Sequence, residues 1–188
     1  MNYKSKETLG IIFAIIAYFS FSILDAIQKS AVLYYSIFQL LFIKYIFVLL
    51  LSILEARRTK NITFYRSNNL KLQIIRSLLS ILESGFFVLS FKYLSLANAH
   101  SIGALAPIII VVLSVFILNE KVSIKTWVAI FIGFIGVLIV IRPGSDVFSV
   151  ESFIPLIAAF FLGLYQIATK KMTEYDPLEV SLFYSSLV

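Results

Sequence analysis

Long apolar runs separated by short polar segments make up most of the chain. A helix needs about 20 apolar residues to cross about 30 Å of hydrocarbon, and six runs approach or exceed that length. They cover residues 9–27, 36–54, 71–91, 96–118, 126–142 and 152–169. A seventh run opens near Leu178 and continues to Val188, the last residue of the sequence. The pattern predicts an all-α polytopic membrane protein.

The most apolar runs lack the polar stripe that a soluble helical bundle would show. A helix on the surface of a soluble protein alternates apolar and polar positions with a period of 3.6 residues, whereas residues 108–118 and 127–141 are apolar on every side. The composition agrees, because 60 % of the residues are hydrophobic and 14 % charged, against about a quarter charged in an ordinary soluble domain. Lipid or protein must therefore surround these helices.

Basic residues concentrate in alternate connecting segments. Of the 16 Lys and Arg residues, 11 precede the first run or follow the second, fourth and sixth runs. The positive-inside rule places such segments, and with them the N-terminus, in the cytoplasm. The net charge of +6 is divided among short segments rather than gathered along one face, which argues against nucleic acid as a partner. The expected partners are the lipid bilayer and a small-molecule substrate.

Chemistry-bearing residues are too few for an enzyme. The chain has no Cys and a single His, His100, which excludes disulfides, thiolate metal sites and multi-histidine metal centres. An intramembrane protease would need a Ser–His arrangement or two facing aspartates, but Asp25 lies in a run and Asp176 in a connecting segment. The sequence contains no Gly-rich phosphate loop and no His-Glu-x-x-His motif. We therefore expect neither catalysis nor a cofactor.

A weak internal repeat relates the two ends of the chain. An offset of 141 residues places Lys29 on Lys170, Tyr34 on Tyr175 and, further along, Leu41 on Leu182. A repeat of five helices contains an odd number, so its second copy would be inverted in the membrane, as in many transporters. On this interpretation residues 1–145 form the first repeat and residues 146–188 begin the second. The biased composition can also produce such a match by chance.

Several motifs resemble those of the EamA-like proteins of the drug/metabolite transporter superfamily. They are YLSLANA at 93–99, Pro107, LNEKVS at 118–123, Trp127, Gly133, Gly136 and RPG at 142–144. The resemblance implies ten helices in two inverted five-helix halves, in the inner membrane of a bacterium. Lys44 stands where the family often has Arg, which keeps the charge but loses the planar fork. A family member would continue for about three and a half more helices, so the sequence looks like a first half with the start of a second.

Three charged residues lie within predicted spans, where a charge normally faces a partner or a watery cavity. A rise of about 1.5 Å per residue places Lys44 roughly 15 Å and Glu83 roughly 18 Å from the cytoplasmic ends of their helices. This shared depth predicts an ion pair, which is either a permanent structural pair or a pair opened by substrate or proton. Asp25 lies nearer the outer end, where it could cap a turn or line a cavity mouth.

Other polar or helix-breaking residues are candidates with less specific signals. His100 is either an interfacial hydrogen-bonding residue or a proton relay. Tyr165 and Gln166 form a polar surface on the sixth run that could bind substrate or simply join helices. Pro107 is either a transport hinge or a passive kink. Arg76, close to the cytoplasmic end of its span, is expected to extend its guanidinium to the membrane surface.

The combined prediction is a secondary transporter that moves a small polar metabolite by alternating access, with a proton as candidate coupling ion. The family resemblance suggests amino acids, nucleotide-related metabolites such as S-adenosylmethionine, or drugs as substrates, and no residue selects among them. Two alternatives remain open at this point. One is a structural or assembly subunit that transports nothing, and the other is a half-size transporter that works as a dimer.

Overall fold

The protein folds into helices joined by short connections, as shown by a computed structural model that describes residues 3–59, 65–141 and 149–187. Within these ranges the chain forms eight α-helices, one short 3-10 helix and no strand. The elements are α1 (Tyr3–Ala31), α2 (Ile37–Arg58), α3 (Leu70–Tyr93), α4 (Leu96–Gly103), α5 (Ala106–Ile117), α6 (Ile124–Ile141), η1 (Val150–Ser152), α7 (Phe153–Met172) and α8 (Leu178–Leu187). The predicted all-α fold is confirmed.

Within the described part of the chain, five helical segments are long and apolar enough to cross a membrane. They are α1, α2, α3, the pair α4 and α5 taken together, and α7 with η1. The predicted span 126–142 corresponds to α6, whose apolar part, Ile124–Ile139, is shorter than the other five. Residue 142, where that prediction ends, is outside the described ranges. The structure thus supports a polytopic membrane protein.

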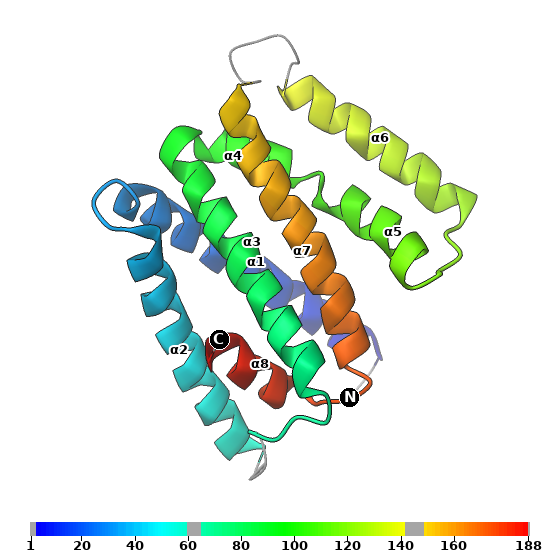
Figure 1. Cartoon of the computed structure of the whole chain (residues 1–188). Helices are drawn as coiled ribbons and strands as arrows, with labels where there is room; N and C mark the ends of the chain where they lie inside the picture. Colours follow the sequence, from blue (N-terminus) through cyan, green and yellow to red (C-terminus); the bar gives the residue numbers. More distant parts are fainter. Residues whose placement is uncertain (1–2, 60–64, 142–148, 188) are drawn as a thin grey trace.

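Helices α3 and α7 lie side by side at the centre of the bundle and run in opposite directions (Figure 1). Helix α8 packs against α2 and α3, while α5 packs on the other side of α7. Helix α6 lies outside α5 and contacts α4 and α5 (Figure 1). Helix α3 is flanked on both sides, and among the described residues it carries more buried polar side chains than any other helix: Gln73, Arg76, Ser77, Ser84 and Ser90.

Polar residues define where several helices begin. Ser36 and Gln39 form a capping box at the start of α2, each side chain accepting a hydrogen bond from the other residue's backbone N–H. Asn69 caps α3 and Ser95 caps α4 in the same way, each through one accepted bond. Such caps satisfy backbone donors that have no partner inside the helix. The first residues of α2, α3 and α4 are therefore determined by the local sequence.

The predicted span 96–118 is two helices rather than one. Helix α4 ends at Gly103, and Pro107 lies in the first turn of α5. Proline has no N–H to donate to the carbonyl four residues earlier, and its ring clashes with that carbonyl, here the one of Gly103. The helix therefore stops at Gly103 and restarts where Pro107 needs no backbone partner.

A glycine of α7 permits a close helix contact, whereas two glycines of α6 have open space around them. A Cβ atom at Gly163 of α7 would lie 3.0 Å from Leu113 Cδ1 and 3.1 Å from Ile109 Cγ2 of α5. Gly133 and Gly136 of α6 would meet no described atom within 4 Å. Close packing thus joins α7 to α5, while the small-residue face of α6 has no described neighbour.

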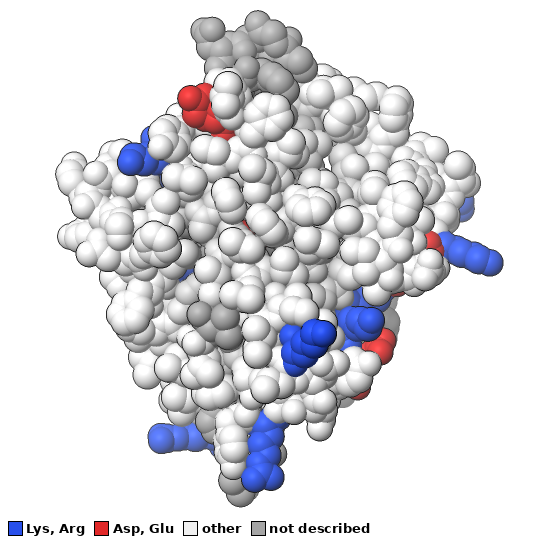
Figure 2. All heavy atoms as spheres, in the orientation of Figure 1, with Lys and Arg blue, Asp and Glu red and all other residues white. Residues whose placement is uncertain are grey.

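The basic connections lie at one end of the bundle. The α2–α3 connection touches the α7–α8 turn through a 2.7 Å hydrogen bond from Asn68 Nδ2 to the Tyr175 carbonyl. The α5–α6 connection reaches the end of α7 through an ion pair between Glu120 and Lys170. Most of the basic side chains in Figure 2 lie toward this lower end, where α1 also begins in Figure 1. The segments that the charge pattern grouped together are therefore together in space.

Candidate functional site

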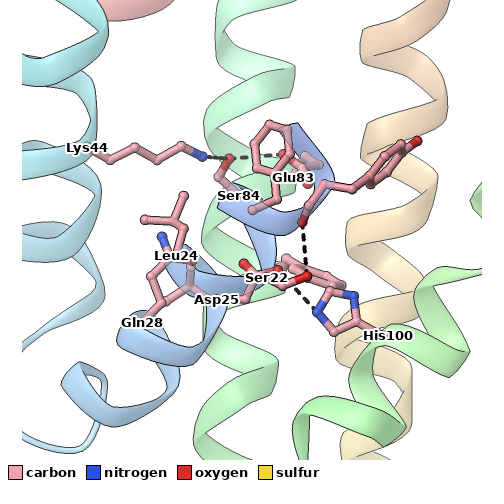
Figure 3. Close-up of a pocket in the computed structure, with 12 residues that line it drawn as sticks. Ser22, Leu24, Asp25, Gln28, Lys44, Glu83, Ser84 and His100 are labelled. Carbon is pink, nitrogen blue, oxygen red and sulfur yellow. Dashed lines mark hydrogen bonds and ion pairs between the residues drawn. The ribbon is translucent and has the colours of Figure 1, made fainter. Parts of the chain in front are cut away.

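A polar cavity of about 420 Å³ opens among α1, α2, α3 and α4. Its lining includes three charged side chains from three different helices, Asp25 of α1, Lys44 of α2 and Glu83 of α3, and the imidazole of His100 from α4. Figure 3 shows these four side chains converging with Ser84 and Gln28. Four residues that the sequence singled out separately thus share one site.

Lys44 and Glu83 are joined through a hydroxyl group rather than by direct contact. Lys44 Nζ donates to Ser84 Oγ over 2.7 Å, and Ser84 Oγ donates to Glu83 Oε2 over 2.9 Å (Figure 3). Consecutive residues of an α-helix point about 100° apart, so Ser84 faces α2 while Glu83 points further around α3. The predicted direct ion pair between Lys44 and Glu83 is therefore not found in this structure, where the Ser84 hydroxyl lies between the two charged groups instead.

Asp25 and His100 form the second pair in the cavity. His100 Nε2 lies 3.2 Å from Asp25 Oδ2, and the side chains are 50 % and 18 % exposed, respectively. The His100 ring also packs edge-on against Phe87, with ring centroids 5.2 Å apart. Asp25 therefore does not cap a turn in this structure but contacts another helix inside a cavity.

A lysine one helical turn beyond Asp25 fixes α1 in place. Lys29 Nζ donates to the carbonyl of Leu94 over 2.9 Å and also to the carbonyl of Phe91. These carbonyls end α3, where a positive charge is favourable. Residues four apart share a helix face, so this contact also turns Asp25 toward the cavity.

A second and more apolar cavity, of about 600 Å³, adjoins the first. The two share four lining residues: Tyr18, Glu83, Phe87 and His100. The other lining residues come from α4, α5, α7 and the α4–α5 break, and they are Gly103, Ala104, Ala106, Pro107, Ile110, Ala158, Ala159 and Leu162. Pro107, predicted as a hinge, thus lines the apolar cavity at a break between helices.

Arg76 is buried, so the prediction that it reaches the membrane surface is wrong. Only 2 % of the residue is exposed. Its guanidinium donates to Gln73 Oε1 over 3.1 Å, to Ser185 Oγ over 2.8 Å and to the carbonyl of Ser181. These acceptors belong to α3 and α8 and replace the water that a surface position would supply. The guanidinium can therefore stay inside the bundle.

Tyr165 belongs to this Arg76 cluster rather than to either cavity. Its hydroxyl lies 3.4 Å from Arg76 Nη1, from which it accepts a bond, and the guanidinium lies over its ring. Gln166, the next residue of α7, is exposed and lines neither cavity. Substrate contact by these two residues therefore stays a prediction, and the described contacts give Tyr165 a role in joining helices.

Asp176 is a buried polar residue that the sequence analysis named only as an aspartate outside the predicted spans. It is 5 % exposed and accepts hydrogen bonds from Ser67 Oγ, the Asn68 backbone N–H and Gln73 Nε2. Although burial by itself raises the pKa of Asp176, these hydrogen bonds outweigh it and hold the pKa below its usual value. The Asp-Pro step before the last apolar run is a helix-start signal that could have drawn attention to it.

Comparison with known proteins gives a family match over most of the chain. Residues 8–142 match the model of the EamA-like transporter family. The S-adenosylmethionine uptake transporter of Rickettsia bellii is 27% identical over 132 residues, covering 68% of this chain and 45% of the relative. The riboflavin transporter of Vibrio cholerae is 38% identical over 71 residues, covering 38% of this chain and 24% of the relative.

A longer match is to a transporter whose name gives no substrate. An uncharacterized transporter of Helicobacter pylori is 27% identical over 174 residues, covering 92% of this chain and 58% of the relative. The chain thus spans about half the length of the curated relatives it matches. No solved structure matches.

Proposed function

Because this chain belongs to the EamA-like transporter family, we propose that its polar cavity is the substrate site of a secondary transporter that works by alternating access. The observation that carries the proposal is the convergence of Asp25, Lys44, Glu83 and His100 from four apolar helices on one cavity. Charges within membrane helices are costly and normally face a substrate path or a partner. A transporter needs such a path, whereas an enzyme is not indicated by the family.

The proposed substrate is a small polar metabolite. Relatives are named as transporters of S-adenosylmethionine and of riboflavin, so amino-acid-like and nucleotide-like compounds are the first candidates. A cavity of about 420 Å³ is within the range of roughly 300–1,000 Å³ that holds small organic ligands. The relatives differ in substrate, so the substrate must be found by experiment.

In the proposed mechanism the Lys44–Ser84–Glu83 contact is exchanged for contacts to substrate. Lys44 comes from α2 and Glu83 from α3, so breaking the bridge frees two helices to move relative to each other. A ligand drives such a change only if it binds one facing state more tightly than the other. A proton on one of the four polar groups is the candidate coupling ion.

Helix directions support an inverted repeat. The sequence match pairs α1 with α7 and α2 with α8, and in each pair the two helices run in opposite directions (Figure 1). This is the relation that two inverted halves require. We propose that residues 1–145 form the first half and that residues 146–188 belong to the second. A dimer of such chains would be an alternative way to complete a transporter.

Flux through proteoliposomes tests the function. The intact gene product, reconstituted with a panel of labelled amino acids, S-adenosylmethionine and riboflavin, should accumulate at least one of them. Glu83→Gln should abolish that uptake, because the bridge to Lys44 loses its charge. Glu55→Gln is the matched control, because Glu55 pairs with Arg58 at the end of α2, away from the cavity.

Each outcome of this experiment has a meaning. Unaltered uptake by Glu83→Gln would rule out the proposed role of Glu83. Ligand retention without flux would refute transport and favour the structural or assembly subunit.

A further inference from the structure

The two carboxylates of the polar cavity, Asp25 and Glu83, have basic partners of different kinds. Glu83 is linked through Ser84 to the ammonium group of Lys44, so this carboxylate has a basic side chain as its partner. Asp25 pairs with His100, whose imidazole is charged only when protonated. With the carboxyl groups of Asp25 and Glu83 ionised, Lys44 protonated and the imidazole neutral, the residues lining this cavity carry one more negative than positive charge. A ligand with a positive charge would restore the balance.

Asp25 is accessible to such a ligand. Its side chain is 18 % exposed and its histidine partner 50 % exposed, so a bound molecule can approach the carboxylate without unpacking a helix. Tyr18 and Phe87 line both cavities beside it. Aromatic faces attract organic cations. These two rings therefore add to the preference of the Asp25 carboxylate for a positively charged ligand.

The adjoining cavity favours an apolar group. Its volume is about 600 Å³, and its charged or titratable lining residues, Glu83 and His100, are both shared with the polar cavity. The rest of the described lining is glycine, alanine, proline and branched aliphatic side chains, with Tyr18 and Phe87 at the shared border. A single ligand can therefore place a charged end in one cavity and a ring in the other.

We propose that the ligand is an organic cation, such as a protonated amine, a sulfonium or a quaternary ammonium, that carries an apolar or aromatic group. Its charge lies beside Asp25 and its apolar group lies between α4, α5 and α7. This inference rests on the proposed function of the cavity as the substrate site. It adds to that function the sign of the substrate's charge and the apolar character of the group attached to it.

A series of three probes separates the two parts of the proposal. Isothermal titration of the purified intact gene product would compare benzyltrimethylammonium, tetramethylammonium, which lacks the ring, and benzyl alcohol, which lacks the charge. The first should bind about ten-fold more tightly than either of the others, a difference of about 1.4 kcal/mol. Equal affinity for benzyl alcohol would overturn the cationic preference, and equal affinity for tetramethylammonium would overturn the apolar subsite.

Variants assign the two ends of the probe to the two cavities. Asp25→Asn should weaken benzyltrimethylammonium binding about ten-fold, and unchanged affinity would overturn the role of Asp25. Ala104→Leu, at an exposed position that lines the apolar cavity, should weaken benzyltrimethylammonium but not tetramethylammonium. Ala97→Leu is the matched control, because Ala97 is exposed on α4, which ends just before Ala104, and lines neither cavity.

The inference and the proposed function fail in different ways. Selective binding of the aromatic cation by a protein that moves no solute across vesicles would refute transport and leave cation recognition standing. Uptake of a neutral or anionic metabolite by a protein that ignores the cation series would refute the ligand class and leave transport standing.

Discussion

At the residue scale, Arg76 shows how a charged side chain is kept inside an apolar bundle. Its guanidinium has acceptors on α3, α7 and α8, namely Gln73, Tyr165, Ser181 and Ser185. Only a planar group with several donors in fixed directions can serve acceptors on three helices at once. Arg76 therefore ties α8 to the central helix pair.

Replacing Arg76 by lysine keeps the positive charge but removes the planar guanidinium group and its hydrogen bonds to several acceptors. Arg76→Lys should lower the stability by about 1–3 kcal/mol, the cost of leaving buried polar groups unsatisfied. The thermal unfolding midpoint in detergent measures this loss. Arg58→Lys, at an exposed side chain that pairs only with Glu55 among the described residues, should leave the midpoint unchanged. Equal midpoints for both variants would contradict the structural role of Arg76.

At the scale of the helices, the close approach of α7 to α5 depends on Gly163, which has no side chain. Leu113 and Ile109 occupy the space that a larger residue at position 163 would need. These helices form one wall of the apolar cavity, with Pro107 and Ile110 on α5 and Ala158, Ala159 and Leu162 on α7. The geometry of the cavity therefore depends on that helix contact.

Overpacking this contact should destabilise the protein. Gly163→Leu is expected to cost about 1–3 kcal/mol, because extra carbons in a packed interface force side chains and backbone to shift. Unfolding in a series of sodium dodecyl sulfate mixtures would report the loss. Gly136→Leu provides the comparison, because a Cβ there meets no described atom within 4 Å. A Gly163→Leu protein as stable as the Gly136→Leu protein would show that the contact is loose.

At the scale of the whole molecule, the connections divide into a basic end and an opposite end (Figures 1 and 2). The basic end is predicted to face the cytoplasm. The Asp25–His100 pair lies near the opposite end of the bundle, since Asp25 is within two turns of the end of α1 and His100 belongs to the short helix α4. The buried Arg76 and Asp176 contacts lie toward the basic end. The two groups of polar contacts thus lie toward opposite ends of the bundle.

Labelling of single cysteines in intact cells tests this orientation. The sequence contains no Cys, so each introduced thiol reports alone within this chain. Tyr34→Cys, in the exposed connection between α1 and α2, should react with a membrane-impermeant maleimide. Arg58→Cys, at the basic end, should react only after the membrane is permeabilised, because it faces the cytoplasm. The reverse pattern would invert the proposed topology.

The sequence by itself determined the elements of this protein, because each is set by interactions within a few residues. Hydropathy placed the spans, and the length of the apolar runs identified the membrane class. Serine or asparagine at positions 36, 69 and 95 begins a helix by accepting a hydrogen bond from the backbone N–H three residues later. Pro107 predicted an interruption, although the break falls at residues 104–105.

Only the tertiary structure decided which polar residues meet. An apolar helix has no polar stripe to show which face turns inward, and each residue changes the direction of a side chain by about 100°. The sequence therefore predicted the depth of Lys44 and Glu83 but neither the bridging hydroxyl of Ser84 nor the partner of Asp25. The sequence also predicted a surface position for Arg76. That prediction failed because two of the acceptors that keep the guanidinium buried belong to α8, more than 100 residues later in the chain.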